Sequence, residues 1–299
     1  MRIKIFEVGP RDGLQNEVKI LSLEQKKHFI ELLSQAGHSD IEVGAFVNPQ
    51  KIPQMANTKE LTKALGKSLK TQYWNLVPND RGFQDAAESG VKNIAIFTAA
   101  SETFNQRNIN TSIDGSFERF ETFLPNAKKL KMRIRGYVST CFGCPYEGVI
   151  NPKAVLKVTE RLLKLGVHEI SIGDTIGVAN PKQVEKLTKS LLKLMGSKKL
   201  ALHFHDTRGT ALANILAGLQ AGVKIFDSSS GGLGGCPYAP GAAGNVATED
   251  LLYMLHEMGF DTGINLAKQV QASQYVQSCL NRTLPSRYLQ AATKNSTNS

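Results

Sequence analysis

The stretch Leu200-Ala-Leu-His203-Phe-His205-Asp206 has the apolar character of a buried strand and ends in polar side chains. Successive side chains of a strand point to opposite faces, so we expect both histidines to lie on the same side. A second strand-like run, residues 225–229, follows after helical sequence. A strand, a helix and a further strand form the repeating unit of parallel α/β folds. This stretch therefore predicts one such unit, with two imidazoles at the end of its strand.

The same alternation runs along almost the whole chain. Apolar, β-rich runs occur eight times, at residues 3–8, 40–46, 73–77, 93–97, 133–139, 169–173, 200–205 and 225–229. Amphipathic segments separate them, for example residues 23–36, 152–165 and 181–195, and the last two begin with a proline suited to the first turn of a helix. Eight such units predict an α/β fold of the (β/α)8 TIM-barrel type. A doubly wound open sheet is the alternative, but the glycine fingerprint expected after its first strand is missing.

Helical sequence continues beyond the eighth strand. We expect residues 248–258 to form the closing helix, residues 265–280 an added helix and residues 294–299 a frayed tail. We find no linker and no low-complexity segment. The chain is therefore predicted to be a single TIM-barrel domain over residues 1–299, with about residues 264–299 as a short C-terminal helical extension and tail.

Composition excludes several classes of protein. Apolar residues make up 41% of the chain and charged residues 21%, which are ordinary globular values. No run approaches the roughly 18 consecutive apolar residues of a membrane span. Strand-like alternation begins at residue 3, which leaves no room for a signal or transit peptide. We therefore expect a cytoplasmic protein without a membrane partner.

The net charge of +10 is compatible with an anionic partner. The basic residues fall mostly at helical spacing on predicted outer helices, within residues 157–164 and 182–199, as on a solvated face. A non-enzymatic binder of nucleic acid or protein is the competing interpretation, but the chain offers no base-stacking or groove-reading motif. A basic surface still favours a polyanionic small molecule such as coenzyme A.

Four cysteines do not indicate a secreted disulfide framework in a chain of 299 residues. Cys141 and Cys144 form a Cys-x-x-Cys pair, but neither a second pair nor a histidine at zinc spacing accompanies it. Pro145 and Gly148 follow, whereas a thioredoxin-like redox motif leads into a helix. We expect Cys141 and Cys279 to be reduced structural thiols.

The predicted barrel brings scattered polar residues to one end of the molecule. Active sites of TIM barrels lie at the C-terminal ends of the strands and on the loops that follow. The candidates that fall there are Arg11, Asp12, Glu42, Asp174, His203, His205 and Asn245. Two imidazoles near a carboxylate indicate a divalent metal site, although a His-x-His pair alone is also compatible with ordinary buried histidines.

Four motifs connect the chain with a known family. They are Glu7-Val-Gly-Pro-Arg-Asp-Gly-Leu-Gln-Asn-Glu17, Val138-Ser-Thr-Cys-Phe-Gly-Cys-Pro-Tyr-Glu-Gly148, Ile172-Gly-Asp-Thr-Ile-Gly177, and Gly232-Leu-Gly-Gly-Cys-Pro-Tyr238 running on to Gly244-Asn-Val-Ala-Thr-Glu-Asp250. With these motifs the chain resembles the 3-hydroxy-3-methylglutaryl-CoA lyases over about residues 5–281. The first motif and the His-x-His are shared with a wider superfamily of metal-dependent lyases and synthases, whereas the Cys-Pro-Tyr loop is more specific to the lyases.

The resemblance implies a metal-dependent retro-Claisen cleavage of 3-hydroxy-3-methylglutaryl-CoA to acetyl-CoA and acetoacetate. It implies a divalent cation held by Asp12, His203, His205 and, more weakly, Asn245. Such a mixed oxygen and nitrogen shell suits Mg²⁺ or Mn²⁺, and two imidazoles favour Mn²⁺. The base that accepts the proton of the substrate's hydroxyl group is His203 or Asp12, and the sequence leaves both open.

Further roles follow from the same resemblance. Arg11 contacts the substrate and stabilises the enolate oxygen, a role compatible with pairing to Glu42 inside the barrel mouth. Cys236, in a glycine-rich loop, supplies a proton to the enolate. Glu42 and Asp174 orient ligands or Arg11, while Gln15 contacts water at the metal or caps its loop. The partner is an acyl-CoA substrate, and the resemblance also implies a noncovalent homodimer.

The loop after the second strand, residues 44–53, departs from the family pattern. Relatives often carry Ser at Ala45 and Trp at Lys51, and the loop is expected near the acyl end or the pocket mouth. A lyase or synthase acting on another 3-hydroxyacyl-CoA is therefore the alternative function. The sequence also leaves open whether the pathway is leucine catabolism or ketone-body formation.

Some polar residues are expected to lie outside the site. His28, His38, His168 and His256 have no evident partners and are expected at the surface. Asp206 is out of phase with the two histidines and is expected to be the N-cap of the next helix.

Overall fold

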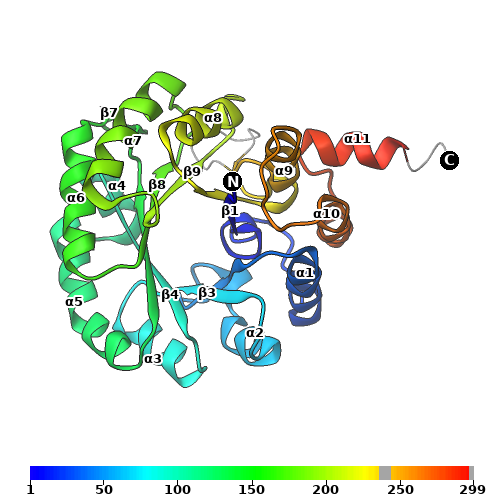
Figure 1. Ribbon diagram of the computed structural model, residues 1–299. Helices are drawn as coiled ribbons and strands as arrows, with labels where there is room; N and C mark the ends of the chain where they lie inside the picture. Colours follow the sequence, from blue (N-terminus) through cyan, green and yellow to red (C-terminus); the bar gives the residue numbers. More distant parts are fainter. Residues whose placement is uncertain (236–243, 296–299) are drawn as a thin grey trace.

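The computed structural model describes residues 1–235 and 244–295, and its eight parallel strands close into a barrel (Figure 1). The hydrogen-bonded order around the barrel is β1, β10, β9, β8, β5, β4, β3 and β2. The strands are β1 (Lys4–Glu7), β2 (Asp40–Ala45), β3 (Gln72–Leu76), β4 (Asn93–Ala99), β5 (Arg133–Ser139), β8 (Glu169–Asp174), β9 (Leu200–Phe204) and β10 (Ile225–Ser228). The predicted (β/α)8 barrel is confirmed.

Helices surround the barrel, as Figure 1 shows. They are α1 (Leu23–Ala36), α2 (Thr58–Leu65), α3 (Asp80–Glu88), α4 (Glu102–Ile109), α5 (Ile113–Lys129), α6 (Pro152–Lys164), α7 (Pro181–Met195), α8 (Ala211–Ala221), α9 (Thr248–Glu257), α10 (Leu266–Leu280) and α11 (Arg287–Asn295). Short elements lie in the loops: a π-helical turn η1 (Gly9–Gly13), 3-10 turns η2 (Pro53–Met55) and η3 (Ser230–Gly232), and a small hairpin of β6 (Gly143–Cys144) and β7 (Gly148–Val149).

Two of the outer helices begin with the same capping arrangement, an asparagine N-cap followed by proline. The Asn151 side chain accepts a hydrogen bond from the backbone N–H of Lys153 at the start of α6, and Asn180 does so from Gln183 in α7. Each helix then begins with proline, whose fixed φ suits the first turn and whose missing N–H is not needed there. The apolar face of each helix packs onto the barrel through residues such as Val155 and Leu191. None of the helices in the described part of the chain combines the length and apolar character that crossing a membrane requires.

The C-terminal extension packs on one side of the barrel. Helix α10 lies against α1 and α9, and α11 continues from it (Figure 1). The tail predicted from residue 294 is wrong for its first two residues, because Lys294 and Asn295 end α11. Residues 296–299 lie outside the described part of the chain.

His38 corrects the prediction that it lies at the surface, because it is buried at the start of a polar network. Its Nε2 atom lies 2.7 Å from Oε1 of Gln269 on α10. The Gln269 amide nitrogen donates to Glu249 on α9 and to Ser230 in η3. Since this leaves the Gln269 oxygen as the acceptor, His38 donates through Nε2–H. Glu7 on β1 reaches the same turn by accepting from the Ser230 N–H. The network therefore joins the added helix to the root of the glycine-rich loop.

We expect the Glu249→Gln variant to gain stability relative to the wild-type protein as pH rises from about 5 to about 8. Burial raises the pKa of Glu249 from 4.5 to about 7. Between these values the folded protein keeps a proton that the unfolded chain releases, so wild-type stability falls as pH rises through this window. A glutamine at position 249 does not titrate, so the variant loses no stability from this group between about pH 5 and about pH 8. Urea unfolding of both proteins across the pH series measures the difference.

The matched control for this experiment is Glu185→Gln. Glu185 is an exposed glutamate on α7 that pairs with Lys189. Its replacement should leave the pH profile of stability parallel to the wild-type profile. Parallel profiles for Glu249→Gln as well would contradict a proton held by the folded protein at that site.

Candidate active site

A tight turn directly after β1 carries Arg11 and Asp12 to the C-terminal mouth of the barrel. The turn, η1, is a single π-helical turn that begins with Gly9 and Pro10. A Cβ atom at Gly9 would lie 2.5 Å from Oε1 of Glu7, and one at Gly13 would lie 2.7 Å from the Leu233 Cβ atom. Gly13 is therefore required, because Leu233 leaves no room for a side chain, whereas a Cβ atom at Gly9 would displace the Glu7 carboxylate and crowd the Ser230 nitrogen at 3.2 Å.

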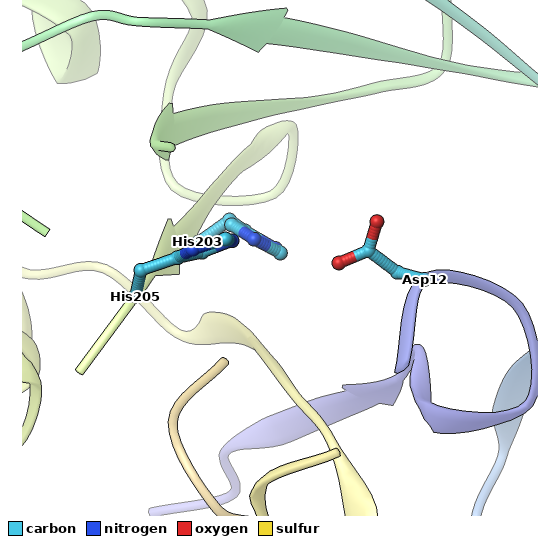
Figure 2. A group of neighbouring side chains, drawn as sticks. All are labelled: Asp12, His203 and His205. Carbon is cyan, nitrogen blue, oxygen red and sulfur yellow. The ribbon is translucent and has the colours of Figure 1, made fainter. Parts of the chain in front are cut away.

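Asp12, His203 and His205 converge at this mouth, and Figure 2 shows both imidazoles pointing toward the Asp12 carboxylate. One nitrogen or oxygen atom from each residue lies within 4.8 Å of the others. His203 lies on β9 and His205 directly follows it, so the period of the strand places both on one side as predicted. Among the described residues, this group has the donor atoms and spacing to hold a metal ion.

Asn245 completes the group from the other side of the glycine-rich loop. It forms an isolated antiparallel bridge with His205, and its amide nitrogen donates to Oδ2 of Asp12 at 2.8 Å. Its carbonyl oxygen Oδ1 is buried without a hydrogen-bond partner. A buried oxygen without a partner costs free energy unless an ion or a donor satisfies it. Asn245 therefore offers a fourth donor, an amide oxygen, beside the three clustered side chains.

The charge states of His205 and Asp12 suit a cation. Burial opposes the charged form of His203, but the neighbouring Asp227 carboxylate raises the pKa of His203, so a cation there must displace its proton. Burial lowers the pKa of His205 to about 4, so its imidazole is neutral near pH 7. Burial alone would raise the pKa of Asp12, but the Arg11 guanidinium and the two histidines hold it below its usual value. A neutral imidazole and an ionised carboxylate are the forms that bind metal. The donor set is thus a carboxylate, two imidazoles and an amide oxygen.

Arg11 lies between two carboxylates. Its Nε and Nη2 atoms contact Oε2 of Glu42 at 2.6 and 2.5 Å, and its Nη1 atom donates to Asp12 at 2.8 Å. Burial opposes the charged form, but the nearby Glu42 carboxylate raises the pKa of Arg11 above its already high value. The predicted pairing of Arg11 with Glu42 is therefore present, and it fixes the guanidinium beside the clustered donors.

The remaining site predictions have mixed outcomes. Gln15 donates to Oδ1 of Asp12 at 3.3 Å, so it contacts the cluster directly. Asp174, at the end of β8, accepts from the backbone N–H groups of Val178 and Ala179 and so holds its own loop. Cys236 lies outside the described residues.

Asp206 differs from its predicted role. The N-cap of α8 is Thr210, four residues further along the chain. The Asp206 carboxylate nevertheless accepts from the backbone N–H of Ala211, the first residue of the helix, at 2.9 Å. The prediction of the cap residue is wrong because the chain makes an additional turn after β9, although the carboxylate still satisfies a donor of the first helical turn.

A cavity of about 490 Å³ opens beside the clustered donors. Asp12, His203 and His205 line one part of it, and Val47, Asn48, Lys51 and Ile52 of the loop after β2 line another. Ala45 is buried with its N–H bonded to Thr58 and is not among the lining residues. The expectation that this loop reaches the pocket is therefore confirmed for its later residues.

Sequence reasoning missed several residues that line the cavity. They include Tyr137 and Ser139 on β5, Ser171 on β8, and Phe97, Arg119 and Phe120. The sequence feature that could have indicated the residues on β5 was Arg135, a charged residue inside a strand whose neighbouring residues are mostly apolar. The period of two places Arg135, Tyr137 and Ser139 on the same face, which is the interior of the barrel.

Comparisons with known proteins agree with this geometry. The model of the HMGL-like family matches residues 2–276. The mitochondrial hydroxymethylglutaryl-CoA lyase of Pongo abelii is 49% identical over 98% of this chain and 90% of its own length. The names of similar relatives place some in mitochondria and others in the cytoplasm.

Solved structures give the same result. The crystal structure of hydroxymethylglutaryl-CoA lyase from Pseudomonas aeruginosa superposes with a TM-score of 0.96 at 45% identity, covering 98% of both chains. An HMG-CoA lyase from Acinetobacter baumannii, in complex with coenzyme A and 3-methylmalate, superposes with a TM-score of 0.93 at 39% identity, covering 97% of this chain and 95% of that one.

Proposed function

The chain belongs to the HMGL-like family, and from that premise we propose that it is a hydroxymethylglutaryl-CoA lyase. It cleaves 3-hydroxy-3-methylglutaryl-CoA to acetyl-CoA and acetoacetate. The observation that carries this proposal is the convergence of Asp12, His203 and His205 beside the buried charge of Arg11, at the edge of a cavity. The nearly full-length similarity to named lyases supports the same reaction.

The residues that would hold the cation are Asp12, His203, His205 and Asn245. Asn245 would use the buried Oδ1 atom that has no other partner. Mg²⁺ and Mn²⁺ both accept this donor set, and the two imidazoles favour Mn²⁺. When bound, the cation would polarise the oxygen atoms of the substrate and so make its hydroxyl group more acidic.

Proton removal from that hydroxyl group begins the cleavage. Asp12 accepts the proton if both imidazoles bind the cation, and His203 accepts it only if its Nε2 atom is not a ligand; both residues lie at the cavity wall. The electron pair of the O–H bond then forms the ketone of acetoacetate, and the carbon–carbon bond breaks to release the enolate of acetyl-CoA. The enolate carbon must finally receive a proton.

Arg11 supplies the positive charge that the enolate oxygen requires. Its contacts with Glu42 hold the guanidinium in one orientation, so little reorganisation is needed when negative charge develops. Cys236 supplies the final proton, because a thiol with a reference pKa of about 8.5 is largely protonated at neutral pH. Gln15 positions Asp12 through its amide group.

The test is acetoacetate release from 3-hydroxy-3-methylglutaryl-CoA by metal-stripped protein. We expect no release without metal and restored release on addition of Mg²⁺ or Mn²⁺. A folded protein that releases no acetoacetate with either cation would contradict the proposal. The measurement also tests the cation requirement separately from the reaction. Acetoacetate release that persists in metal-stripped protein would support the proposed lyase reaction but contradict its dependence on a cation.

A second candidate is cleavage or condensation of a different 3-hydroxyacyl-CoA at the same site. The loop after β2 favours it, because Lys51 and Ile52 line the cavity. Rates measured with acyl-CoA analogues that differ at the 3-position would distinguish the two substrates. The cytoplasmic location, the homodimer and the single-domain organisation stay predictions.

A further inference from the structure

A chain of charged side chains, buried except for the half-buried Lys4, crosses the barrel interior from its N-terminal end to the candidate active site. Lys4, at the start of β1, pairs with Asp40 and with Glu169 at 3.2 and 3.1 Å. Glu169 accepts from Nε of Arg135 at 2.7 Å, and Arg135 in turn reaches Asp227 on β10. Arg135 and Asp227 are almost completely buried. A buried ionic network does not by itself stabilise a fold. Because this network ends at the candidate active site, its position indicates a functional role.

Asp227 is the last member of this chain before the site, and its two oxygens have different surroundings. Oδ1 accepts from Nη2 of Arg135 at 2.6 Å. Oδ2 accepts from Nη1 of Arg135 at 3.2 Å and from the Ser171 hydroxyl at 2.7 Å. The same Oδ2 atom lies 3.3 Å from Nδ1 of His203. Asp227 is thus held by Arg135 and Ser171 on one side and faces the imidazole on the other.

His203 has no alternative partner for this nitrogen within the described residues. Its Nδ1 atom is buried and makes no hydrogen bond of standard geometry, and Oδ2 of Asp227, 3.3 Å away, is the ion-pair partner found for it among the described residues. An acceptor at Nδ1 favours the tautomer with the proton on Nδ1, which leaves the lone pair of Nε2 free. Asp12 and His205 line the cavity together with His203, and one donor atom of each lies within 4.8 Å of the others.

We propose that Asp227 is a positioning residue that fixes the tautomer and orientation of His203, so that Nε2 of His203 is presented to the cation. Arg135 and Ser171 hold Asp227 in place for this purpose. The proposal rests on the metal site of the proposed function. Metal-binding histidines generally donate their second N–H to a carboxylate, carbonyl or water, and loss of that partner typically costs about 10- to 100-fold in metal affinity.

His205 provides a contrast within the same site. Its Nδ1 atom is also buried, but no hydrogen-bond or ion-pair partner is found for it among the described residues. Its backbone N–H bonds instead to the carbonyl oxygen of Asp174. Among the described residues a carboxylate therefore lies beside Nδ1 of His203 but not beside Nδ1 of His205, and a change at Asp227 should affect His203 alone.

The Asp227→Asn variant tests the tautomer directly. The amide nitrogen cannot occupy the Oδ1 position, because it would face the Nη2 donor of Arg135 at 2.6 Å. At the Oδ2 position the amide loses only the longer 3.2 Å contact with Nη1 of Arg135, and the Ser171 hydroxyl can rotate to accept from it. The other amide hydrogen then points at Nδ1 of His203 and favours the opposite tautomer, which places a proton on Nε2.

The experiment compares wild-type, Asp227→Asn and Asp40→Asn proteins by titration with Mn²⁺ alone. The nitrogen chemical shifts of His203 are recorded in metal-free protein above the pH at which imidazole titrates. Asp40 is a matched control, because it is a buried carboxylate of the same network but contacts Lys4 and Trp74 at the other end of the barrel. We expect Asp227→Asn to weaken Mn²⁺ binding about 10- to 100-fold. We also expect the chemical shifts of Nδ1 and Nε2 of His203 to change places, because the proton moves from Nδ1 to Nε2. Asp40→Asn should change neither quantity, even if it lowers thermal stability.

Two outcomes would overturn the proposal. One is Mn²⁺ affinity and His203 shifts in Asp227→Asn that equal those of the wild-type protein. The other is an equal loss of affinity in Asp40→Asn, which would indicate a structural effect. Failure of the wild-type protein to bind Mn²⁺ would instead reject the metal site of the proposed function, while acetoacetate release reports on that function independently.

Discussion

Replacing Arg11 with methionine is expected to lower kcat about 10²- to 10³-fold, with a smaller effect on KM. The guanidinium is fixed by Glu42 and Asp12 before substrate binds, so its charge is available when the enolate oxygen becomes negative. Methionine fills similar space but carries no charge and no N–H donors. Steady-state release of acetoacetate measures both constants.

The same substitution has a structural consequence that must be separated from catalysis. Glu42 is completely buried, and without Arg11 its carboxylate loses its counterion. Removing one partner of a buried pair typically destabilises a protein by about 3–5 kcal/mol. The double variant Arg11→Met with Glu42→Gln removes the orphaned charge and should recover much of the lost stability.

The double variant decides between the two roles of Arg11. If Arg11 stabilises the enolate, kcat stays low in the double variant even though the protein regains stability. Recovery of kcat together with stability would mean that Arg11 acts only as the counterion of Glu42. Urea unfolding and acetoacetate release on the same preparations provide both measurements.

The strands were predictable from sequence because each barrel strand is a short, β-rich run in which apolar residues predominate or alternate with a few polar ones. Residues 133–139 coincide with β5, and residues 200–205 exceed β9 by one residue. Side chains of such strands face either the surrounding helices, which select apolar residues, or the barrel interior, which here also holds paired charges such as Arg135 and Asp227. The pattern therefore indicates which segments are buried, and short buried segments of this kind are strands.

The candidate site was predictable to the extent that it follows from strand ends. Asp12, His203 and His205 lie at the ends of strands, and closing the barrel brings such ends together. Tyr137 and Asp227 lie deeper and look like ordinary strand residues in the sequence. Their partners are on other strands, and pairing across the interior depends on which strands face one another. A single sequence does not contain that information.

His38 illustrates the same limit outside the site. It follows α1 in a turn, where a polar residue normally meets solvent. Helix α10 covers this turn and supplies Gln269 as its partner, from 231 residues further along the chain. The surface prediction is wrong because a long-range contact buries a locally exposed position.

Replacing His205 with alanine is expected to reduce both Mn²⁺ affinity and kcat/KM by at least about 100-fold. The loss should exceed the roughly 10- to 100-fold effect of an outer partner, because a proposed ligand is removed. His205 is neutral and buried beside Asp12, so no solvent-exposed side chain stands ready to replace it. Calorimetric titration with Mn²⁺ and steady-state kinetics measure the two quantities separately.

The informative comparison for His205→Ala is Cys236→Ser. A serine hydroxyl is a far weaker acid than a thiol, so loss of the proposed proton donor should lower kcat about 10²- to 10⁴-fold and leave Mn²⁺ affinity unchanged. Cys279→Ser is the matched thiol control, because Cys279 is a buried cysteine on α10 in the C-terminal extension. If Cys236→Ser weakens Mn²⁺ binding as much as His205→Ala does, then Cys236 serves the cation rather than the enolate. If it changes kcat no more than Cys279→Ser, the final proton comes from another group at the cavity wall.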